Sequence, residues 1–248
     1  IDVDKLKPLK LVINSGNGSA GPVVDLLIDK LAQAGAPIEV LKLHHTPDGS
    51  FPNGIPNPMI EANRTATQQA VLENKADLGI AFDGDFDRCF LFDEYGEFID
   101  GSYVVGMLAQ AFLNKYAGES IVYDPRVIYN TEAVIDEHNG KAVISKSGHS
   151  FIKQVMRDSG AVYGGEMSAH HYFRDFFYCD SGMIPWLLTI ELLSITGKTL
   201  SEVVSGYIAA YPSSGELNFH LTTHDAPAII SAIEEKFSTE NPTKSMLD

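Results

Sequence analysis

Residues 10–43, KLVINSGNGSAGPVVDLLIDKLAQAGAPIEVLKL, contain the pattern that decides the fold class. The run KLVIN (10–14) is short, apolar and rich in β-branched residues, which indicates a buried strand. A Gly-Asn-Gly turn follows, and residues 22–34 show helical periodicity that ends at Gly35. A second strand pattern, PIEVLKL (37–43), comes next. This order of strand, turn, helix and strand predicts a parallel sheet covered by helices.

The same rhythm continues along the chain. We predict further helices over residues 57–74, 103–115, 130–139, 150–159, 182–195 and 201–211. We predict further strands over residues 77–82, 120–123, 142–145 and 161–163, and a hairpin formed by 90–93 and 97–99. The repeated units indicate two similar three-layer α/β/α domains with mostly parallel mixed sheets.

We place the first domain at residues 1–98 and the second at 99–212. A fresh strand pattern (216–223) and a helix pattern (226–237) follow. They predict the start of an incomplete C-terminal α+β element over residues 213–248, so the sequence reads as a piece of a longer protein.

The bulk composition limits the classes of partner. The chain has 248 residues, 18 Lys+Arg against 33 Asp+Glu, and a formal net charge of −15. This charge argues against nucleic-acid and anionic-membrane partners, which favour basic surfaces. No apolar run approaches the ~20 residues of a membrane span, and nothing at the start resembles a signal peptide. Cys89 and Cys179 have no metal or disulfide spacing, so we expect reduced thiols in the cytoplasm.

The stretch TPDGSFPNGIPNP (46–58) contains four prolines. Loops of this length inside compact domains are usually functional or disordered. We therefore treat it as a candidate functional loop.

The sequence Asp83-Gly-Asp85-Phe-Asp87-Arg88 directly follows the apolar strand pattern GIAF. Three carboxylates at alternating positions past a strand end can converge on one hard cation, and Mg²⁺ prefers such oxygen ligands. A bound cation also explains how these carboxylates avoid mutual repulsion. Arg88 offers a guanidinium fork to a phosphate. The carboxyl ends of parallel strands are where α/β proteins bind ligands.

Three other interpretations of this segment remain open. A calcium-binding EF-hand loop accounts for the aspartate spacing, but it requires glycine where Arg88 stands and helices on both sides. A phosphatase of the haloacid-dehalogenase type also places two aspartates after a strand, with threonine or valine where Asp87 stands. A solvated acidic turn explains neither Arg88 nor the preceding strand.

Two more loops contain candidate binding residues. In Gly165-Glu-Met-Ser-Ala-His-His171, Glu166 and Ser168 are spaced to contact adjacent sugar hydroxyls. The alternative is a polar turn with both histidines exposed. His149 precedes a predicted helix, and Arg126 follows a predicted strand end. An arginine in that position is often only a surface salt-bridge partner.

These motifs resemble those of the α-D-phosphohexomutase superfamily, in particular its phosphomannomutase/phosphoglucomutase type. DGDFDR is similar to the family's metal loop DGDGDR, and GEMSAH is similar to its sugar-binding loop GEMSGH. Phe86 and Ala169 replace the glycines of these two patterns. LVINSGNGSAG, PDGSFPNGIPNP and SGH (147–149) also resemble family segments, with Ser147 in place of threonine.

The resemblance implies roles for the candidate residues. Asp83, Asp85 and Asp87 would hold Mg²⁺, and Arg88 would steady the phosphoryl group in flight. Glu166 and Ser168 would bind the 3- and 4-hydroxyls of a hexose, and His149 and Arg126 would contact the sugar phosphate. His170 would serve as general acid or base. His171 has no counterpart in the motif and is expected to be structural or exposed.

The resemblance implies reversible phosphoryl transfer between O6 and O1 of a hexose phosphate. The expected substrate and product are mannose 6-phosphate and mannose 1-phosphate. A phosphoserine would donate the phosphoryl group, and a sugar bisphosphate would be the intermediate and activator. Segments resembling the family's TASHNP serine loop and RxSNTEP phosphate clamp are absent from the sequence. The alternatives are phosphoglucomutase activity, or a fragment that binds Mg²⁺ and sugar phosphate but is inactive alone.

Overall fold

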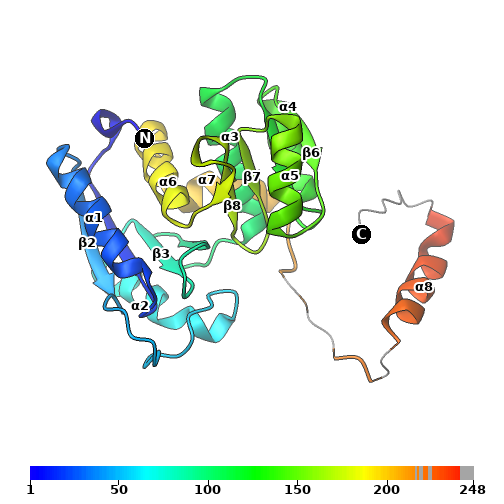
Figure 1. Cartoon of the computed structure of the whole chain (residues 1–248), viewed down its shortest axis with the longest axis horizontal. Coiled ribbons are helices and arrows are strands. Elements are labelled where there is room, and N and C mark those ends of the chain that lie inside the picture. Colours follow the sequence, from blue (N-terminus) through cyan, green and yellow to red (C-terminus); the bar gives the residue numbers. More distant parts are fainter. Residues whose placement is uncertain (216, 218–219, 223–224, 241–248) are drawn as a thin grey trace. The chain divides into compact units, whose positions relative to one another are not determined.

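The computed structural model describes residues 1–215, 217, 220–222 and 225–240. Ile1–Ser213 form one compact unit, and Ser214–Asp248 are assigned to a second. The larger unit contains two sheets, both visible in Figure 1. The two α/β domains expected from the sequence are therefore present, each with a mostly parallel mixed sheet.

The first sheet has the strand order β2-β1-β3-β4. Its strands are β1 (Leu9–Asn14), β2 (Ile38–Leu43), β3 (Leu78–Phe82) and β4 (Cys89–Phe92). β1 pairs in parallel with β2 and β3, while β4 runs antiparallel to β3. Helix α1 (Ala20–Gln33) packs on Leu11 and Ile13, and α2 (Thr65–Asn74) packs on Val12. Because side chains alternate along β1, the two helices cover opposite faces of the sheet.

The second sheet repeats this plan with the order β6-β5-β7-β8-β9. Its strands are β5 (Ser120–Tyr123), β6 (Lys141–Ile144), β7 (Tyr163–Gly165), β8 (His171–Phe173) and β9 (Cys179–Asp180). β5 is parallel to β6 and β7, and β8 and β9 form an antiparallel edge. Its helices are α3 (Gly101–Lys115), α4 (Ile128–Glu137) and α5 (His149–Ser159).

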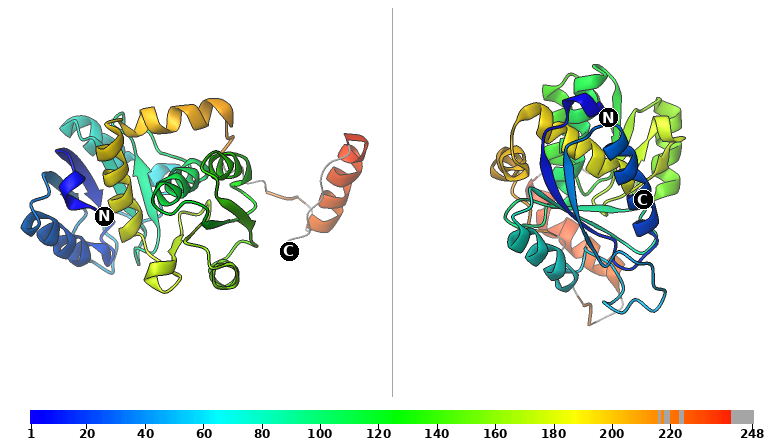
Figure 2. Two further views of the ribbon diagram at one scale, coloured as in Figure 1. Left: turned by 90° about the horizontal axis from the view of Figure 1, so that it is seen from above. Right: turned by 90° about the vertical axis from the view of Figure 1, so that its left-hand side faces the viewer.

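Helix α6 (Met183–Thr196) packs against both domains. It is apolar on all sides and contains the fully buried Trp186, as expected for a helix surrounded by protein. Figures 1 and 2 show it, in yellow, between the blue and green parts of the chain. One core cluster contains residues of α6 and of both sheets. The domains of the larger unit therefore share a core, and loops from both can be held at their junction.

The remaining elements are short or terminal. Helix α7 (Leu200–Ala210) starts with a capping box formed by Thr199 and Glu202. The 3₁₀ turns are η1 (Val3–Lys5), η2 (Glu61–Asn63), η3 (Arg174–Phe176) and η4 (Ser238–Glu240). Helix α8 (Ala226–Phe237) has the predicted bounds. Four residues of the predicted strand over 216–223, namely 216, 218, 219 and 223, lie outside the described residues.

In the first domain one predicted element was wrong and another is shorter than predicted. The helix predicted from residue 57 begins only at Thr65, because the Arg64 side chain donates to the carbonyls of Pro58 and Met59 and holds that segment as turns. The hairpin predicted from residues 90–93 and 97–99 is present in a short form, with an antiparallel bridge between Phe92 and Phe98 and hydrogen bonds from Asp93 N to Glu97 O and from Ile99 N to Leu91 O. On its other edge β4 pairs with β3.

The predictions for the second sheet were also partly wrong. The strand predicted over 161–163 lies at Tyr163–Gly165, and the β8–β9 edge was missed. These strands have only two or three residues, too few to show a period of two in the sequence. The predicted loop at 166–170 is the tight connection between β7 and β8, closed by a hydrogen bond from Glu166 N to His170 O at 3.0 Å.

Candidate active site

Three aspartates converge in the loop after β3, residues 83–88, which we call the aspartate loop. One ligand oxygen from each of Asp83, Asp85 and Asp87 lies within 4.8 Å of the others. Asp83 is buried, Asp85 is exposed and Asp87 is half-buried. The Oδ1 atom of Asp87 is buried and has no hydrogen-bond partner among the described residues. Three oxygen donors at this spacing, one of them unsatisfied, fit a Mg²⁺ ion.

Arg88 lies against the same carboxylates. Its Nε donates to Asp83 Oδ2 at 2.6 Å and lies 3.7 Å from Asp87 Oδ1. Burial raises the pKa of Asp83, and the Arg88 guanidinium opposes that rise. Since these contacts are made through Nε, the two terminal nitrogens of Arg88 are not used by either aspartate.

Glu166 lies at the end of β7 in the connection between β7 and β8, residues 166–170, which we call the hairpin loop. Its side chain is almost fully buried. Oε1 accepts from Gly148 N at 2.6 Å, and Oε2 accepts from the Tyr172 hydroxyl at 2.6 Å. Each carboxylate oxygen has a further lone pair. The carboxylate is therefore fixed in orientation while retaining acceptor capacity.

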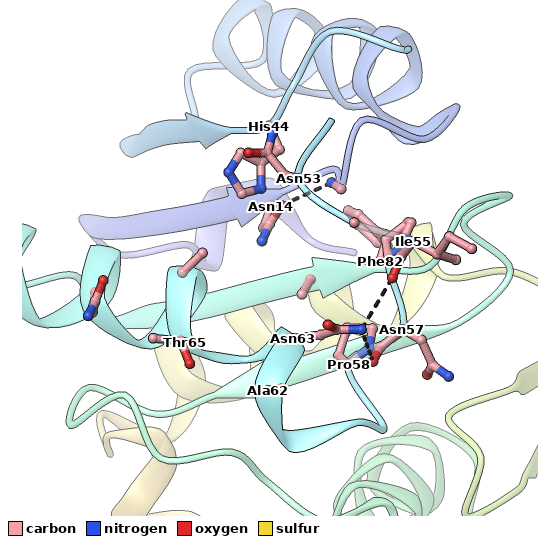
Figure 3. A pocket seen from close by; sticks show the side chains of 16 residues that line it. Asn14, His44, Asn53, Ile55, Asn57, Pro58, Ala62, Asn63, Thr65 and Phe82 are labelled. Carbon is pink, nitrogen blue, oxygen red and sulfur yellow. Dashed lines mark hydrogen bonds between the residues drawn. The ribbon is translucent and has the colours of Figure 1, made fainter. Parts of the chain in front are cut away.

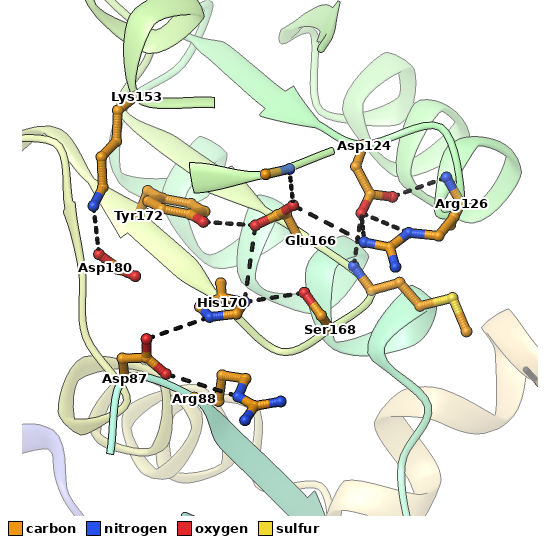
Figure 4. A network of polar contacts seen from close by, with 12 residues as sticks. Asp87, Arg88, Asp124, Arg126, Lys153, Glu166, Ser168, His170, Tyr172 and Asp180 are labelled. Atoms are coloured by element: carbon orange, nitrogen blue, oxygen red, sulfur yellow. Dashed lines mark hydrogen bonds and ion pairs between the residues drawn. The ribbon is translucent and has the colours of Figure 1, made fainter. Parts of the chain in front are cut away.

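Ser168 and His170 form a chain of contacts toward the aspartate loop, drawn in Figure 4. Ser168 Oγ lies 3.0 Å from His170 Nδ1, and His170 Nε2 lies 3.4 Å from Asp87 Oδ2. His170 Nδ1 is also 3.9 Å from Glu166 Oε2. An imidazole between a carboxylate and a hydroxyl can accept or release a proton at either nitrogen.

The aspartate loop and the hairpin loop are joined through their backbones. Arg88 and His170 form an antiparallel bridge, and Cys89 N donates to Ala169 O at 3.3 Å. The Ala169 side chain is buried in a cluster with Phe90 of β4. The structure therefore brings the predicted metal residues and the predicted sugar residues together at one domain junction.

Arg126 and His149 differ in how they are placed relative to Glu166. Arg126 lies 3.9 Å from Glu166 Oε1 and donates to both oxygens of Asp124, once through its backbone N–H. It thus borders the network of Figure 4. His149 is the first residue of α5 and is exposed. Its neighbour Gly148 reaches Glu166, but no side-chain contact in the described part of the chain ties His149 to the network.

Both positions that depart from the family's glycine pattern keep a left-handed backbone. Phe86 has φ of 54° and Ala169 has φ of 69°. This region disfavours residues with a Cβ atom. Each loop therefore places a residue with a Cβ atom in a backbone region that glycine occupies more readily, at some conformational cost.

Four functional neighbours were not predicted from the sequence. They are Asp124, Tyr172, Asp180 and Gly182. Asp124 accepts hydrogen bonds from Arg126 and from Met167 N, and the Tyr172 hydroxyl donates to Glu166. Asp180 of β9 lies close to Asp87 and His170, and Gly182 contacts the backbone of the aspartate loop. Of these four, only Asp124 could have been identified from the sequence, because it precedes Arg126 at a predicted strand end. The other three are identified by contacts between segments distant in sequence.

The proline-rich loop borders a separate pocket, shown in Figure 3. The pocket has a volume of about 270 Å³. Its polar lining includes His44, Asn14, Asn53, Asn57, Asn63 and Gln69. None of the site residues predicted from the sequence lines it.

His171 is buried next to this site and should make stability depend on pH. Burial, with a smaller contribution from His170, lowers the pKa of His171 to about 3 from its ordinary 6.5. The unfolded chain therefore binds a proton below pH 6.5 that the folded chain does not. Above pH 6.5 neutral His171 therefore costs the folded state nothing relative to the unfolded chain. As the pH falls below 6.5, protonation of the unfolded chain lowers the free energy of unfolding. We expect His171 to lower the free energy of unfolding by about 1 kcal/mol between pH 6.5 and 5.5.

Urea denaturation at both pH values checks this expectation. His171→Asn should lose the His171 part of the pH dependence, whereas His138→Asn at the end of α4 should keep the wild-type slope. Equal slopes in wild type and His171→Asn would contradict the prediction.

Two family models match consecutive parts of the chain. The model for phosphoglucomutase/phosphomannomutase, alpha/beta/alpha domain II, matches residues 1–96. The model for alpha/beta/alpha domain III of the same family matches residues 100–211. Between them they cover both sheets of the larger unit.

Comparisons of this chain with individual proteins indicate the same family. The chain is 58% identical over 240 residues to a phosphomannomutase of Salmonella montevideo, covering 97% of this chain and 52% of the relative. It is 59% identical to a phosphomannomutase of Vibrio cholerae, covering 87% of this chain and 47% of that protein. A crystal structure of a phosphoglucomutase/phosphomannomutase family protein from Burkholderia thailandensis has a TM-score of 0.73 and 26% identity, covering 100% of this chain and 64% of that one. The chain thus spans about half the length of the curated relatives it matches.

No described helix has the length and apolar character that a bilayer span requires.

Proposed function

Because the chain belongs to the phosphoglucomutase/phosphomannomutase family, we propose that it forms the metal and sugar part of a phosphomannomutase. The reaction is the reversible transfer of a phosphoryl group between O6 and O1 of mannose phosphate, in the cytoplasm. The observation that carries this proposal is the junction of the aspartate loop and the hairpin loop through the Arg88–His170 bridge. A mutase must hold a metal and a hexose in fixed relation, and this junction supplies that relation.

Each residue has a role in the proposal. Asp83, Asp85 and Asp87 hold Mg²⁺, which when bound neutralises developing charge on the transferred phosphoryl group. The terminal nitrogens of Arg88 contact that phosphoryl group, since its Nε is bonded to Asp83. His170 transfers the proton at the reacting hydroxyl, with Asp87 on one side of its ring.

Recognition of the sugar is assigned to the hairpin loop and its neighbours. Glu166 and Ser168 contact the 3- and 4-hydroxyls, and Arg126 and His149 approach the sugar phosphate. Glucose phosphate is the second candidate substrate, because these contacts leave C2, where glucose and mannose differ, unaddressed. The phosphoryl donor is a serine outside residues 1–248, so this chain alone is expected to bind but not to turn over.

A coupled assay tests the activity. Mannose 1-phosphate and glucose 1-phosphate are supplied in parallel with a catalytic amount of hexose 1,6-bisphosphate and Mg²⁺. We expect turnover by a longer protein that contains this sequence and a serine domain, with the mannose substrate preferred. Turnover by residues 1–248 alone would contradict the assignment of the donor outside the chain.

Asp85→Asn tests the metal assignment without disturbing the core, because Asp85 is exposed. Loss of one anionic ligand should lower Mg²⁺ affinity by at least about tenfold, measured by isothermal titration calorimetry. Asp29→Asn, an exposed aspartate on α1, should leave the affinity unchanged. Equal Mg²⁺ affinity in wild type and Asp85→Asn would remove Asp85 from the site.

A further inference from the structure

The glycine-rich turn after β1, residues 15–21, is a motif to which the proposed function assigns no role. Its sequence is Ser-Gly-Asn-Gly-Ser-Ala-Gly, and it leads from β1 into α1. Because β1 and β3 are parallel neighbours, this turn and the aspartate loop leave the same edge of the sheet. We propose that the glycine-rich turn supports the aspartate loop, with Ser19 as a positioning residue that favours Mg²⁺ over the larger Ca²⁺.

The turn meets the aspartate loop at Gly84, between two of the proposed metal ligands. Gly84 O accepts hydrogen bonds from Ser19 N at 3.0 Å and from Ser19 Oγ at 3.1 Å. Ser19 is the N-cap of α1, where a serine hydroxyl ordinarily caps its own helix. Within the described chain this hydroxyl makes no such cap and bonds to the aspartate loop instead. The two hydrogen bonds fix the backbone between Asp83 and Asp85.

Gly18 allows the two backbones to approach each other. A Cβ atom at Gly18 would lie 2.4 Å from Gly84 O and 3.0 Å from Gly84 Cα. Gly18 does not have a left-handed backbone, so this position requires the absence of a side chain rather than the conformational freedom of glycine. The glycine-rich turn therefore limits how far the aspartate loop can move toward it.

The glycine-rich turn is itself fixed at its start. Asn14 Oδ1 accepts from Gly16 N at 2.9 Å, and Gly18 N donates to Ser15 O at 2.9 Å. Asn14 and Ser15 are both buried. A support that is anchored in the core does not yield together with the loop that rests on it.

Asn17 fastens the turn to the segment that begins the proline-rich loop. Its backbone N–H donates to His44 O at 2.7 Å, and its carbonyl accepts from Asp48 N at 2.9 Å. Its side chain donates to Thr46 O and accepts from Asn53 Nδ2, both at 2.8 Å. The glycine-rich turn is thus held by a second loop on the side that does not face the aspartates.

The spacing of Gly16, Gly18 and Gly21 is also that of the dinucleotide-binding fingerprint G-x-G-x-x-G. In that fingerprint the second glycine lets a pyrophosphate approach the backbone. In this chain the backbone of the aspartate loop makes the close approach to Gly18. The observed packing therefore favours support of the aspartate loop over nucleotide binding.

The stiffness of the loop distinguishes between the two ions. Mg²⁺ requires near-octahedral geometry with bonds of about 2.0–2.1 Å, whereas Ca²⁺ accepts flexible geometry with bonds of about 2.3–2.6 Å. Release of Gly84 would let the neighbouring carboxylates of Asp83 and Asp85 spread, which weakens Mg²⁺ binding more than Ca²⁺ binding. This consequence rests on the proposed metal site, but the support of the metal-free loop does not.

The test titrates Mg²⁺ and Ca²⁺ by calorimetry into the chain of residues 1–248 and its variants. Ser19→Ala should lower Mg²⁺ affinity by about fivefold and Ca²⁺ affinity by less than about twofold. Ser19→Thr keeps a hydroxyl and should restore most of the difference. Ser205→Ala is the matched control, because Ser205 Oγ also donates to a backbone carbonyl, that of Glu202, on the exposed surface of α7. Both affinities of this control should equal those of the wild type.

Amide hydrogen exchange of the metal-free chain provides a readout that does not depend on the ion. Exchange at residues 84–87 should be faster in Ser19→Ala than in the wild type and in Ser205→Ala. Equal exchange in Ser19→Ala and the wild type would overturn the proposal, and so would equal Mg²⁺ affinity. An equal loss of Mg²⁺ and Ca²⁺ affinity that Ser19→Thr does not restore would also overturn it, because that pattern indicates general destabilisation.

A separate outcome identifies failure of the proposed function. If the wild type binds no Mg²⁺ while exchange at residues 84–87 still differs between the wild type and Ser19→Ala, the proposed metal site is wrong. In that case the preference for Mg²⁺ is overturned, and the support of the aspartate loop by the glycine-rich turn is retained.

Discussion

Replacing Gly182 by alanine is expected to displace the aspartate loop and to lower both stability and Mg²⁺ affinity. A Cβ atom at Gly182 would lie 2.6 Å from Phe86 O and 2.7 Å from Arg88 O. Both atoms belong to the backbone, so a rotamer change cannot relieve the clash. Overpacking of this kind lowers the free energy of unfolding by about 1–3 kcal/mol. Because the displaced backbone carries the aspartates, Mg²⁺ affinity should fall by about a hundredfold.

Urea denaturation and calorimetric Mg²⁺ titration of the same samples measure the two effects. Gly206→Ala is the matched control, because Gly206 lies inside α7 and a Cβ atom added there would meet nothing within 4 Å outside its own helix backbone. That variant should be more stable by up to about 1 kcal/mol, since alanine is the better helix former. Wild-type Mg²⁺ affinity in Gly182→Ala would show that the loop tolerates the added methyl group and that the close approach is incidental.

Replacing Glu166 by glutamine should lower hexose-phosphate affinity by about a hundredfold. The substitution is nearly isosteric, but it removes the charge that strengthens hydrogen bonds to Gly148 N–H and the Tyr172 hydroxyl. It also weakens the acceptor offered to sugar hydroxyls, and a hydrogen bond to a charged group contributes about 1.5–3 kcal/mol. Titration of mannose 1-phosphate followed by NMR measures the affinity in the chain itself.

Two variants separate the possible causes. Glu73→Gln, an exposed glutamate on α2, should bind as the wild type does. Tyr172→Phe keeps the carboxylate charge but removes one hydrogen bond to it, so its affinity should lie between those of the wild type and Glu166→Gln. Wild-type affinity in Glu166→Gln would exclude the carboxylate from sugar recognition, whatever the activity of the longer protein.

The parts of the fold that were predicted from the sequence are those with a local physical cause. Strands such as β1 and β3 are buried on both faces and therefore read as continuous apolar runs. Helix α8 is bounded by Asp225, whose side chain caps Ala228 N, and by the end of its apolar periodicity. The aspartate loop was recognisable because its candidate ligands lie within six consecutive residues.

The parts that were missed have causes distant in the sequence. β8 and β9 exist because each pairs with a neighbour in the sheet, although they have only two or three residues each. Helix α2 starts late because one arginine side chain binds two carbonyls of the preceding loop. Neither cause produces a periodic pattern.

The aspartate loop shows the same division most clearly. The sequence alone determined that three carboxylates and an arginine follow a buried strand, because alternating residues past a strand end need no tertiary information. Only the tertiary structure decided what surrounds them. The shared core around α6 brings the hairpin loop to Arg88, places His170 against Asp87, and sets Gly182 under the loop backbone. Packing between two domains places these groups together, and no local property of the chain encodes it.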